Sequence, residues 1–478
     1  MNNKDTNPMA IQDNNIVSKF KSKFSKKKNT EEKEINEFEE LGHIHIDFIG
    51  MNNAIPICAE ACACCWDKKV PEGYQDIAEY IAKRSRIGHT SVIEHSNFVI
   101  LISTPKKFVE ELVDLLDSCN YLNHRTIKSI DGSIYYTILG GSFRGYSDIY
   151  REIDNLNNPI LQAITQTLYT YSHSAMFEDL GRLGLMDLNG FMNTEPDENY
   201  MLLTDTEAMA PESDNDLFKI IGIDSIKKLF NNLHNVNEYV ANSIGIYDLI
   251  KFTTITVLFK NMSRTCTHQL VRHRNAITQE SQRYVDYSSA CFSSPTLFKP
   301  DKYDENHKYT IQFGAGPNQK MTLNELGEEI CKIYGQLFDS HIAGEEYALL
   351  KEDARAYLPG NVQCKKIYIT FTYKNLLKFL NLREHTAAQA EIRKYAVALG
   401  DYFRANTEIN TKEMCDNLTN PRLLVEEPFR IDIDGEIEEK ITPISEDDYI
   451  IAAGLDNISE DSSSDTNVSV EIDENNNV

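Results

Sequence analysis

The chain has 478 residues and a formal net charge of -25, with 48 Lys and Arg against 73 Asp and Glu. This acidic balance argues against a nucleic-acid scaffold, which would normally show a broad basic face. No apolar run approaches the roughly 18–20 residues that a membrane span needs, and the amino terminus lacks a signal-peptide core. The ten cysteines show no secreted-type framework and predict free thiols in a reducing, cytoplasmic compartment.

The two ends of the chain differ from its middle. Residues 1–42 are rich in Asn and Lys and then in Glu, and residues 426–478 hold many acidic residues against only Arg430 and Lys440. Such segments cannot bury enough apolar surface to fold alone. We therefore predict a disordered N-terminal tail, 1–42, and an acidic disordered C-terminal tail, 426–478. The basic tract "SKFKSKFSKKK" belongs to the first tail, with an address signal as the alternative.

Between the tails the apolar pattern predicts a mixture of helices and strands. Helical spacing predicts helices over 73–89, 105–119, 263–273, 324–342, 345–358 and 374–406. Apolar and β-branched runs predict strands over 97–104, 133–141, 251–260 and 364–373. The strand-to-helix segments 97–119 and 251–273 look alike in outline, but their residues show no convincing repeat.

Four cysteines lie close together in "CAEACACC", residues 58–65. Cys58-Ala-Glu60 is similar to the start of a zinc-deaminase motif, which needs a later Pro-Cys-x-x-Cys to complete the metal site. The next cysteine is Cys119, which stands alone. We therefore favour small residues packed in a core over a metal site.

The stretch "GHTSVIEH", residues 88–95, places His89, Ser91, Glu94 and His95 between a helix and a strand. The H-E-x-x-H spacing of a metal site is absent. The ordinary alternative is a pair of structural or exposed histidines.

Arginines gather in "QLVRHRNAITQESQRYVDY", residues 269–287. Guanidinium groups at a helix end suit phosphate or pyrophosphate, and Ser281 with loop amides would complete an anion site. The alternative is a salt-bridged face formed with Glu280 and Asp286.

Arg355 and Arg383 stand in otherwise apolar helical stretches. A buried arginine needs a partner because an unpaired charge in a core is very costly. Glu352 or Glu391 would serve as a structural partner, and a ligand phosphate or an anionic base is the alternative.

These stretches together resemble the flavin-dependent thymidylate synthases. The family signature is Arg-His-Arg, a seven-residue spacer and Ser; here Arg272-His273-Arg274 precedes Ser281 after six residues. "GHTSVIEH" is similar to the family's upstream Gly-His…Glu-His loop, and "ARAYLP" and "FLNLR…AQAEI" resemble its carboxy-terminal half. The resemblance covers 43–100 and 251–416. It implies an α+β fold, an antiparallel-sheet core with packed helices.

The resemblance also implies a domain division: a first segment of the catalytic core (43–104), an inserted region (105–250) and a second segment of the catalytic core (251–425). In the inserted region, "GGSFRGY" (140–146) could bring Arg144 to the site, or form an ordinary hairpin turn. Family members often carry Asn, Arg or His facing the flavin where this chain has Thr372, Lys374 and Lys378.

The site residues that the resemblance implies fall into three groups. FAD would be held by Ser91, Arg272, His273, Arg274 and Gln279. Deoxyuridine monophosphate (dUMP) would be held by Gln269, Arg272, Ser281, Gln282, Arg283, Arg355 and Arg383. His89, beside the flavin and folate, and Arg383, against the uracil, would be catalytic, since a fixed positive charge stabilises a deprotonated, more nucleophilic ring. The resemblance implies no metal.

The implied reaction converts dUMP to dTMP. NADPH would reduce the flavin, 5,10-methylenetetrahydrofolate would give its methylene to the uracil, and flavin hydride would complete the methyl group. The family forms homotetramers, so we expect one here, with neither nucleic acid nor membrane as partner. The alternatives are a noncatalytic nucleotide- and flavin-binding relative whose inserted region binds a partner, and a flavoenzyme that methylates uracil in RNA.

Overall fold

The computed structural model describes residues 44–117, 119, 121–152, 158–183, 185–186, 201–204 and 216–405. All of them belong to one compact unit. The predicted disordered tails, 1–42 and 426–478, lie outside the described residues. Within the described ranges, no helix is long and apolar enough to cross a membrane.

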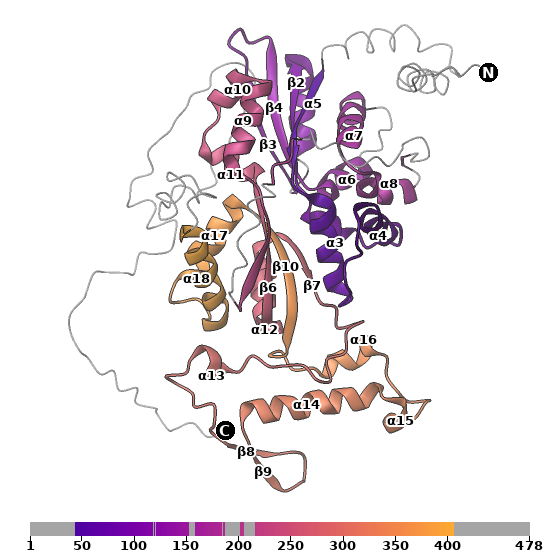
Figure 1. The fold of residues 1–478 in the computed structure, drawn as a ribbon, viewed down its shortest axis with the longest axis vertical. Coiled ribbons are helices and arrows are strands. Elements are labelled where there is room, and N and C mark those ends of the chain that lie inside the picture. The colour runs from indigo at the N-terminus through magenta and orange to yellow at the C-terminus, as the bar shows by residue number, and fades with distance from the viewer. Residues whose placement is uncertain are drawn as a thin grey trace, which may run out of the picture. The chain divides into compact units, whose positions relative to one another are not determined.

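The first sheet has four antiparallel strands in the order β1-β2-β4-β3, of which β2, β3 and β4 are labelled in Figure 1. Its strands are β1 (His45–Met51), β2 (Phe98–Pro105), β3 (Leu122–Lys128) and β4 (Ile134–Gly141). The helical segments around it are α3 (Ala54–Cys65), α4 (Tyr74–Arg86), η3 (Thr90–His95), α5 (Lys106–Asp117), α6 (Phe143–Glu152), α7 (Pro159–Tyr171), η4 (Ser174–Phe177) and α8 (Glu178–Arg182).

The second sheet is also antiparallel, in the order β5-β6-β10-β7. Its strands are β5 (Phe218–Ile223), β6 (Thr254–Ser263), β7 (Ala276–Gln279) and β10 (Gln363–Thr372). Its helical segments are α9 (Ile226–Val236), α10 (Glu238–Ser243), α11 (Ile246–Phe252), α12 (Arg264–Leu270), η5 (Val271–His273), α17 (Tyr373–Glu384) and α18 (Ala390–Ala405).

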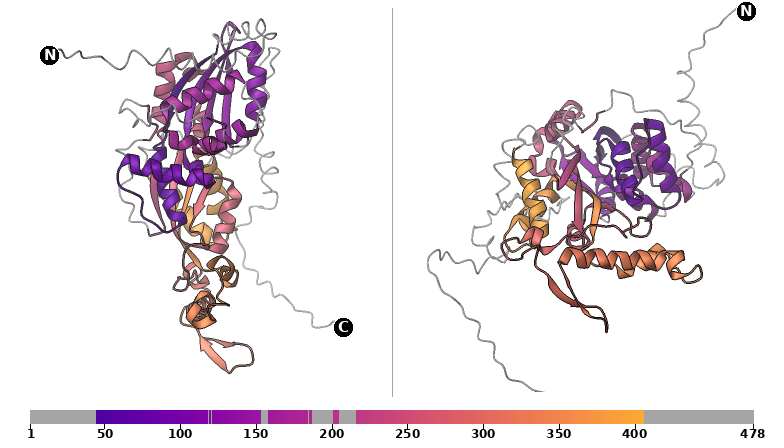
Figure 2. Two further views of the ribbon diagram at one scale, coloured as in Figure 1. Left: turned by 90° about the vertical axis from the view of Figure 1, so that its right-hand side faces the viewer. Right: turned by 60° about the horizontal axis from the view of Figure 1, so that its bottom comes forward.

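A long excursion separates β7 from β10. It contains α13 (Pro295–Phe298), the hairpin β8 (Tyr309–Gln312) and β9 (Asn318–Met321), α14 (Leu323–Phe338), α15 (Ser340–Ala343), α16 (Lys351–Ala354) and η6 (Arg355–Tyr357). Figure 2 shows the hairpin next to α14. A small cluster that includes Tyr287, Phe292 and Tyr334 forms a core of its own here.

Two larger cores hold the sheets. One lies on the face of the first sheet covered by α3 to α8. The other joins side chains of both sheets, such as Leu101 and Phe259, with α9, α11, α17 and α18. Because α3 packs against the first core and also against Tyr368 of the second sheet, it is buried on most of its surface. This explains its small residues: Cys58, Cys62 and Cys64 are all buried, as the packing interpretation predicted.

The α+β fold with antiparallel sheets is confirmed, and most predicted elements exist, with shifted ends. The predicted strand 251–260 begins only at Thr254, since α11 continues to Phe252. The predicted helix 374–406 is two helices, because His385 is extended (φ -60°, ψ 144°). Residues 105–250, predicted as an inserted region, supply β3 and β4 to the first sheet and β5 to the second.

Two predictions were wrong. The helix over 345–358 is reduced to α16 and η6, because Leu350 is extended (φ -67°, ψ 149°) and α16 begins only after it. Residues 140–146 do not form a hairpin turn: β4 ends at Gly141 and α6 begins at Phe143. Arg144 lies on α6 and pairs with Asp148, Nε to Oδ1 at 3.0 Å.

A buried carboxylate joins the two sheets. Asp224, which follows β5, accepts hydrogen bonds from the backbone N of Thr254 (2.9 Å), from the Thr254 hydroxyl (2.7 Å) and from Asn97 Nδ2 (3.0 Å). Asn97 precedes β2 of the first sheet. Burial raises the pKa of Asp224 to about 6, and the hydrogen bonds oppose that rise.

We expect Asp224→Ala to lower the free energy of unfolding by about 2–4 kcal/mol, because it leaves buried donors of Thr254 and Asn97 unsatisfied. Urea denaturation measures this change. The exposed Asp216 is the matched control, and its alanine variant should change stability by less than about 0.5 kcal/mol. Equal effects of the two substitutions would contradict the role of Asp224.

Candidate active site

The arginine cluster stands at the end of a short helix that is fixed at its start. The Ser263 side chain caps α12 by accepting from the backbone N of Cys266. Glu391 of α18 accepts from the backbone N (2.8 Å) and hydroxyl (2.7 Å) of Ser263. The helix runs through η5 to Arg274, whose φ of 51° is left-handed and turns the chain into β7. Glu391 thus positions the helix. It does not pair with Arg383, although the sequence analysis had offered that pairing as an alternative.

Arg383 instead contacts a histidine of the cluster. Its Nε donates to His273 Nε2 at 2.9 Å, and the His273 ring packs edge-on against Phe379, with centroids 5.1 Å apart. Burial and then the Arg383 charge lower the pKa of His273 to about 4. The imidazole is therefore neutral at pH 7, which is the state in which Nε2 can accept a hydrogen bond. The structure thus brings two predicted site residues together from α17 and η5.

The cluster also holds polar groups that are not committed to protein partners. Arg272 and Arg274 are exposed, and neither side chain makes a hydrogen bond or an ion pair within the described ranges. Gln279 Oε1 is buried without a partner there. Gln269 approaches Gln389, Nε2 to Oε1, at 3.5 Å. Free guanidinium groups beside an unsatisfied amide fit an anionic ligand with polar edges.

The second group of predicted site residues follows β7. The backbone N of Ser281 donates to the Cys65 carbonyl at 3.2 Å, and Gln282 is buried. Arg283 pairs with Glu352, Nη2 to Oε2 at 2.7 Å. Arg355 Nε donates to the backbone oxygen of Glu352 at 2.9 Å. Arg283 and Arg355 therefore both contact Glu352, one at its carboxylate and the other at its backbone oxygen.

The predicted alternative pairing with Glu280 is not what the structure shows. Glu280 is fully buried and accepts from the Tyr287 hydroxyl (3.1 Å) and the Lys365 backbone N (2.9 Å). Burial raises the pKa of Glu280.

Aromatic rings connect the first sheet's loop with this segment. His89 packs edge-on against Trp66, with ring centroids 5.0 Å apart, and Trp66 stacks on Tyr284 at 5.7 Å. The Arg84 guanidinium lies 4.5 Å from the Trp66 ring centroid. Ser91 is exposed on the same loop. Sequence reasoning missed Trp66 and Arg84; the signal was that Trp66 is the chain's single tryptophan and follows the cysteine helix.

His95 fixes this loop to the second sheet. Its Nδ1 lies 2.9 Å from the Thr370 hydroxyl on β10, and its Nε2 lies 2.9 Å from the Thr278 hydroxyl on β7. Complete burial lowers the pKa of His95 to about 3. Its neighbour Glu94 has its pKa raised to about 6 by burial, which Arg144 opposes. His95 is therefore structural, in agreement with the alternative given for this stretch.

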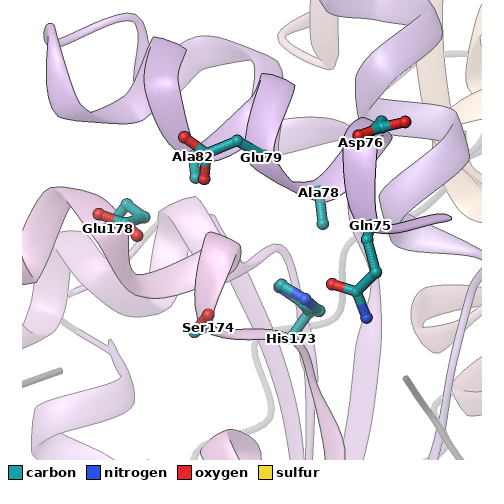
Figure 3. Close-up of a pocket in the computed structure, with 8 residues that line it drawn as sticks. All are labelled: Gln75, Asp76, Ala78, Glu79, Ala82, His173, Ser174 and Glu178. Atoms are coloured by element: carbon teal, nitrogen blue, oxygen red, sulfur yellow. The ribbon is translucent and has the colours of Figure 1, made fainter. Parts of the chain in front are cut away.

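A pocket of 270 Å³ lies away from these groups, between α4 and the η4–α8 segment. Figure 3 shows Glu79, Glu178 and His173 around it. Arg86 bridges the two carboxylates, 3.0 Å from each. None of the predicted site residues lines this pocket, so we place the candidate site at the arginine cluster.

Residues 203–407 match the family model described as "Thymidylate synthase complementing protein". The flavin-dependent thymidylate synthase of Mycobacterium leprae is 29% identical over 159 residues, which are 32% of this chain and 59% of the relative. That of Thermococcus kodakarensis is 31% identical over 166 residues, 34% of this chain and 60% of the relative. The chain thus spans about three fifths of these relatives' length.

A structure of Helicobacter pylori thymidylate synthase X with FAD and dUMP is 18% identical, covering 39% of this chain and 83% of that chain with a TM-score of 0.25. The sequence matches confirm the predicted resemblance: this chain is similar to the flavin-dependent thymidylate synthases, and the family model matches the segment 203–407. The segment carries the arginine cluster and Arg383.

We expect the His95 contribution to stability to be complete above about pH 6.5 and to be lost as the pH falls toward 3. The reason is that the folded pKa lies below the unfolded one, so that the unfolded state takes up the proton first. Between about pH 7 and pH 5 this contribution falls by about 2 kcal/mol. Denaturant unfolding at both pH values measures it.

His95→Gln should lose less stability than the wild type over this pH interval. His341→Gln, at an exposed histidine, should lose as much as the wild type. An unchanged pH dependence in His95→Gln would contradict the assignment.

Proposed function

We propose that this protein is an FAD-dependent methyltransferase that converts dUMP to dTMP with 5,10-methylenetetrahydrofolate and NADPH. The observation that carries the proposal is the contact of Arg383 with a neutral His273, beside Arg272 and Arg274, which have no protein partner within the described ranges. The matches to thymidylate synthases, over the segment that holds these residues, support it.

Five residues would hold FAD: Ser91, Arg272, His273, Arg274 and Gln279. Arg272 and Arg274 suit its pyrophosphate because guanidinium groups bind phosphate in a bidentate manner. Gln279 offers a buried oxygen that has no partner among the residues that the structure describes. Bound FAD supplies the redox chemistry, with electrons from NADPH. His89, against Trp66, would border the flavin and the folate.

The nucleotide would be held by Gln269, Arg272, Ser281, Gln282, Arg283, Arg355 and Arg383. Arg283 and Arg355 already meet at Glu352. Arg383 is oriented through His273, and its permanent charge would stabilise the anionic uracil ring as it gains nucleophilicity. His273 is neutral, and no carboxylate among the described residues pairs with Arg383, so that the charge of Arg383 stays available to the ligand.

We also propose that the reaction takes place in the cytoplasm and that the chain assembles as a homotetramer, as the resemblance implies. The described cysteines are free thiols, which supports a reducing compartment. Light scattering of the purified protein measures the assembly.

FAD binding should quench the fluorescence of Trp66, the single tryptophan, because a flavin near its ring accepts the excitation energy. Arg274→Ala should weaken binding about tenfold or more, since a hydrogen bond to a charged group is worth about 1.5–3 kcal/mol. Arg182→Ala, on the exposed end of α8, serves as the control. If excess FAD produces no quenching and no flavin absorption band, every flavoenzyme interpretation is rejected.

Arg383→Lys should keep the fold and the flavin but slow turnover by at least about 10². Lysine keeps the charge and loses the planar fork that matches the edge of the base. Tritium release from C5 of labelled dUMP measures turnover, with flavin content and melting temperature measured alongside. Arg404→Lys is the control because Arg404 pairs with Glu384 and Asp401.

A folded, flavin-loaded Arg383→Lys variant at the wild-type rate would remove Arg383 from the mechanism. Flavin and dUMP binding by the wild type without any tritium release would favour the noncatalytic relative instead.

A further inference from the structure

The two sheets share one topology. The first has the order β1-β2-β4-β3 and the second β5-β6-β10-β7, so that each sheet places its strands first, second, fourth, third. All pairs are antiparallel in both sheets. In each, a helix follows the second strand directly (α5, α12) and two helices follow the fourth (α6 with α7, α17 with α18). This agreement extends the outline similarity of 97–119 and 251–273 to two whole units.

Irregular details repeat as well. The pairing of β1 with β2 shifts between Phe48 and Gly50, and that of β5 with β6 shifts between Ile220 and Gly222. The sequences there are "FIGMN" (48–52) and "IIGID" (220–224). A bulge at the same place is a specific feature, because an extra residue in a strand disrupts the ladder at that point.

The residues after these strands make the same hydrogen bond. Asn52 Oδ1 accepts from the backbone N of Asn97 at 2.9 Å, and Asp224 Oδ2 accepts from the backbone N of Thr254 at 2.9 Å. Strand register makes Asn97 and Thr254 equivalent positions. We name the segment from β1 to α7, 45–171, the N-terminal repeat, and that from β5 to α18, 218–405, the C-terminal repeat.

In each repeat, the loop before the second strand ends in contact with the sheet of the other repeat. "GHTSVIEHSNF" (88–98) and "GIYDLIKFTTI" (245–255) align without a gap before the second strand, so His95 corresponds to Phe252. His95 bonds Thr370 of the C-terminal repeat. A Cβ added at Gly140, the register equivalent of Thr370, would lie 2.8 Å from Phe252 Cδ1. The two contacts are therefore reciprocal.

We propose that the chain is a tandem pair of one structural unit, and that its ligand site is assembled within a single chain from both repeats, once per chain. The N-terminal repeat supplies the His89 loop and the C-terminal repeat supplies the arginines. The statement about the site rests on the proposed function. It assigns residues 105–171 to one repeat and 218–250 to the other, in place of an inserted region over 105–250.

The equivalent place in the other half, where the loop of the C-terminal repeat meets the sheet of the N-terminal repeat, does not have the histidine and arginines of the candidate site. Strand register places Cys119 and Tyr121 where Arg272 and Arg274 stand, and the gapless alignment places Ile246 at His89. Asp248, the counterpart of Ser91, pairs with Arg125 at 3.7 Å. This second position is therefore a packed, ion-paired contact. The family match, 203–407, also falls on the C-terminal repeat and leaves out the His89 loop.

Carbodiimide coupling tests the arrangement of the repeats without any ligand. Lys366 of the C-terminal repeat lies 3.4 Å from Asp67, which follows α3 of the N-terminal repeat, Nζ to Oδ1. A zero-length cross-link between them should appear in the monomer band of a denaturing gel, identified by peptide mass. Lys366→Arg keeps the charge but removes the amine, and should abolish it. A cross-link confined to a dimer band would overturn assembly within one chain.

Flavin stoichiometry tests the single site. FAD released from the saturated wild type should equal one per chain, and two per chain would overturn the single site while leaving the proposed function standing. Chains carrying His89→Ala and Arg274→Ala, co-expressed with different tags, should bind no more FAD together than each does alone. Recovery in the mixed assembly would show a site shared between chains. Absence of FAD from the wild type rejects the proposed function, and the cross-link still decides how the repeats are assembled.

Discussion

The hydrogen bond between Asn97 and Asp224 joins the two sheets at their adjacent strand ends. Asn97 precedes β2 and follows the loop that carries His89 and His95, whereas Asp224 holds the start of β6, which leads into α12. The position of the loop relative to the arginine cluster therefore depends on a few buried polar groups. His95 adds a second connection through Thr278 and Thr370. Such groups are costly if left unsatisfied, so they specify one arrangement of the sheets.

Burial also sets the charges at the site. His273 is partly buried next to Arg383, and its pKa of about 4 keeps it neutral. An arginine held by a neutral acceptor retains its full charge, whereas pairing with Glu391 would have neutralised it. Glu391 is used elsewhere, at the start of α12. The overall acidic charge of the chain, -25, thus coexists with a positive cluster, since Arg272, Arg274 and Arg383 form no ion pair within the described residues.

The aromatic contact of His89, Trp66 and Tyr284 connects residues far apart in the sequence. Trp66 ends the small-residue helix α3, and Tyr284 follows the Ser281 segment. Most of α3 is buried, and Trp66 directly after it is half-buried between His89, Tyr284 and Arg84. The helix α3, for which the sequence predicted packed small residues, therefore lies between the first sheet and the segment that follows β7.

The sequence by itself determined the α+β class and most strands and helices, and it predicted the resemblance to the flavin-dependent thymidylate synthases, because periodicity and an ordered set of motifs are local properties. It identified His273, Arg383 and the arginines as one group without showing their contacts. Only the tertiary structure decided that Arg383 donates to His273, that Glu352 joins Arg283 to Arg355, and that His95 is buried between sheets. The shared strand order of the two sheets could not be predicted from the sequence either. Strand order and register depend on backbone hydrogen bonds, which can persist after the side chains have diverged.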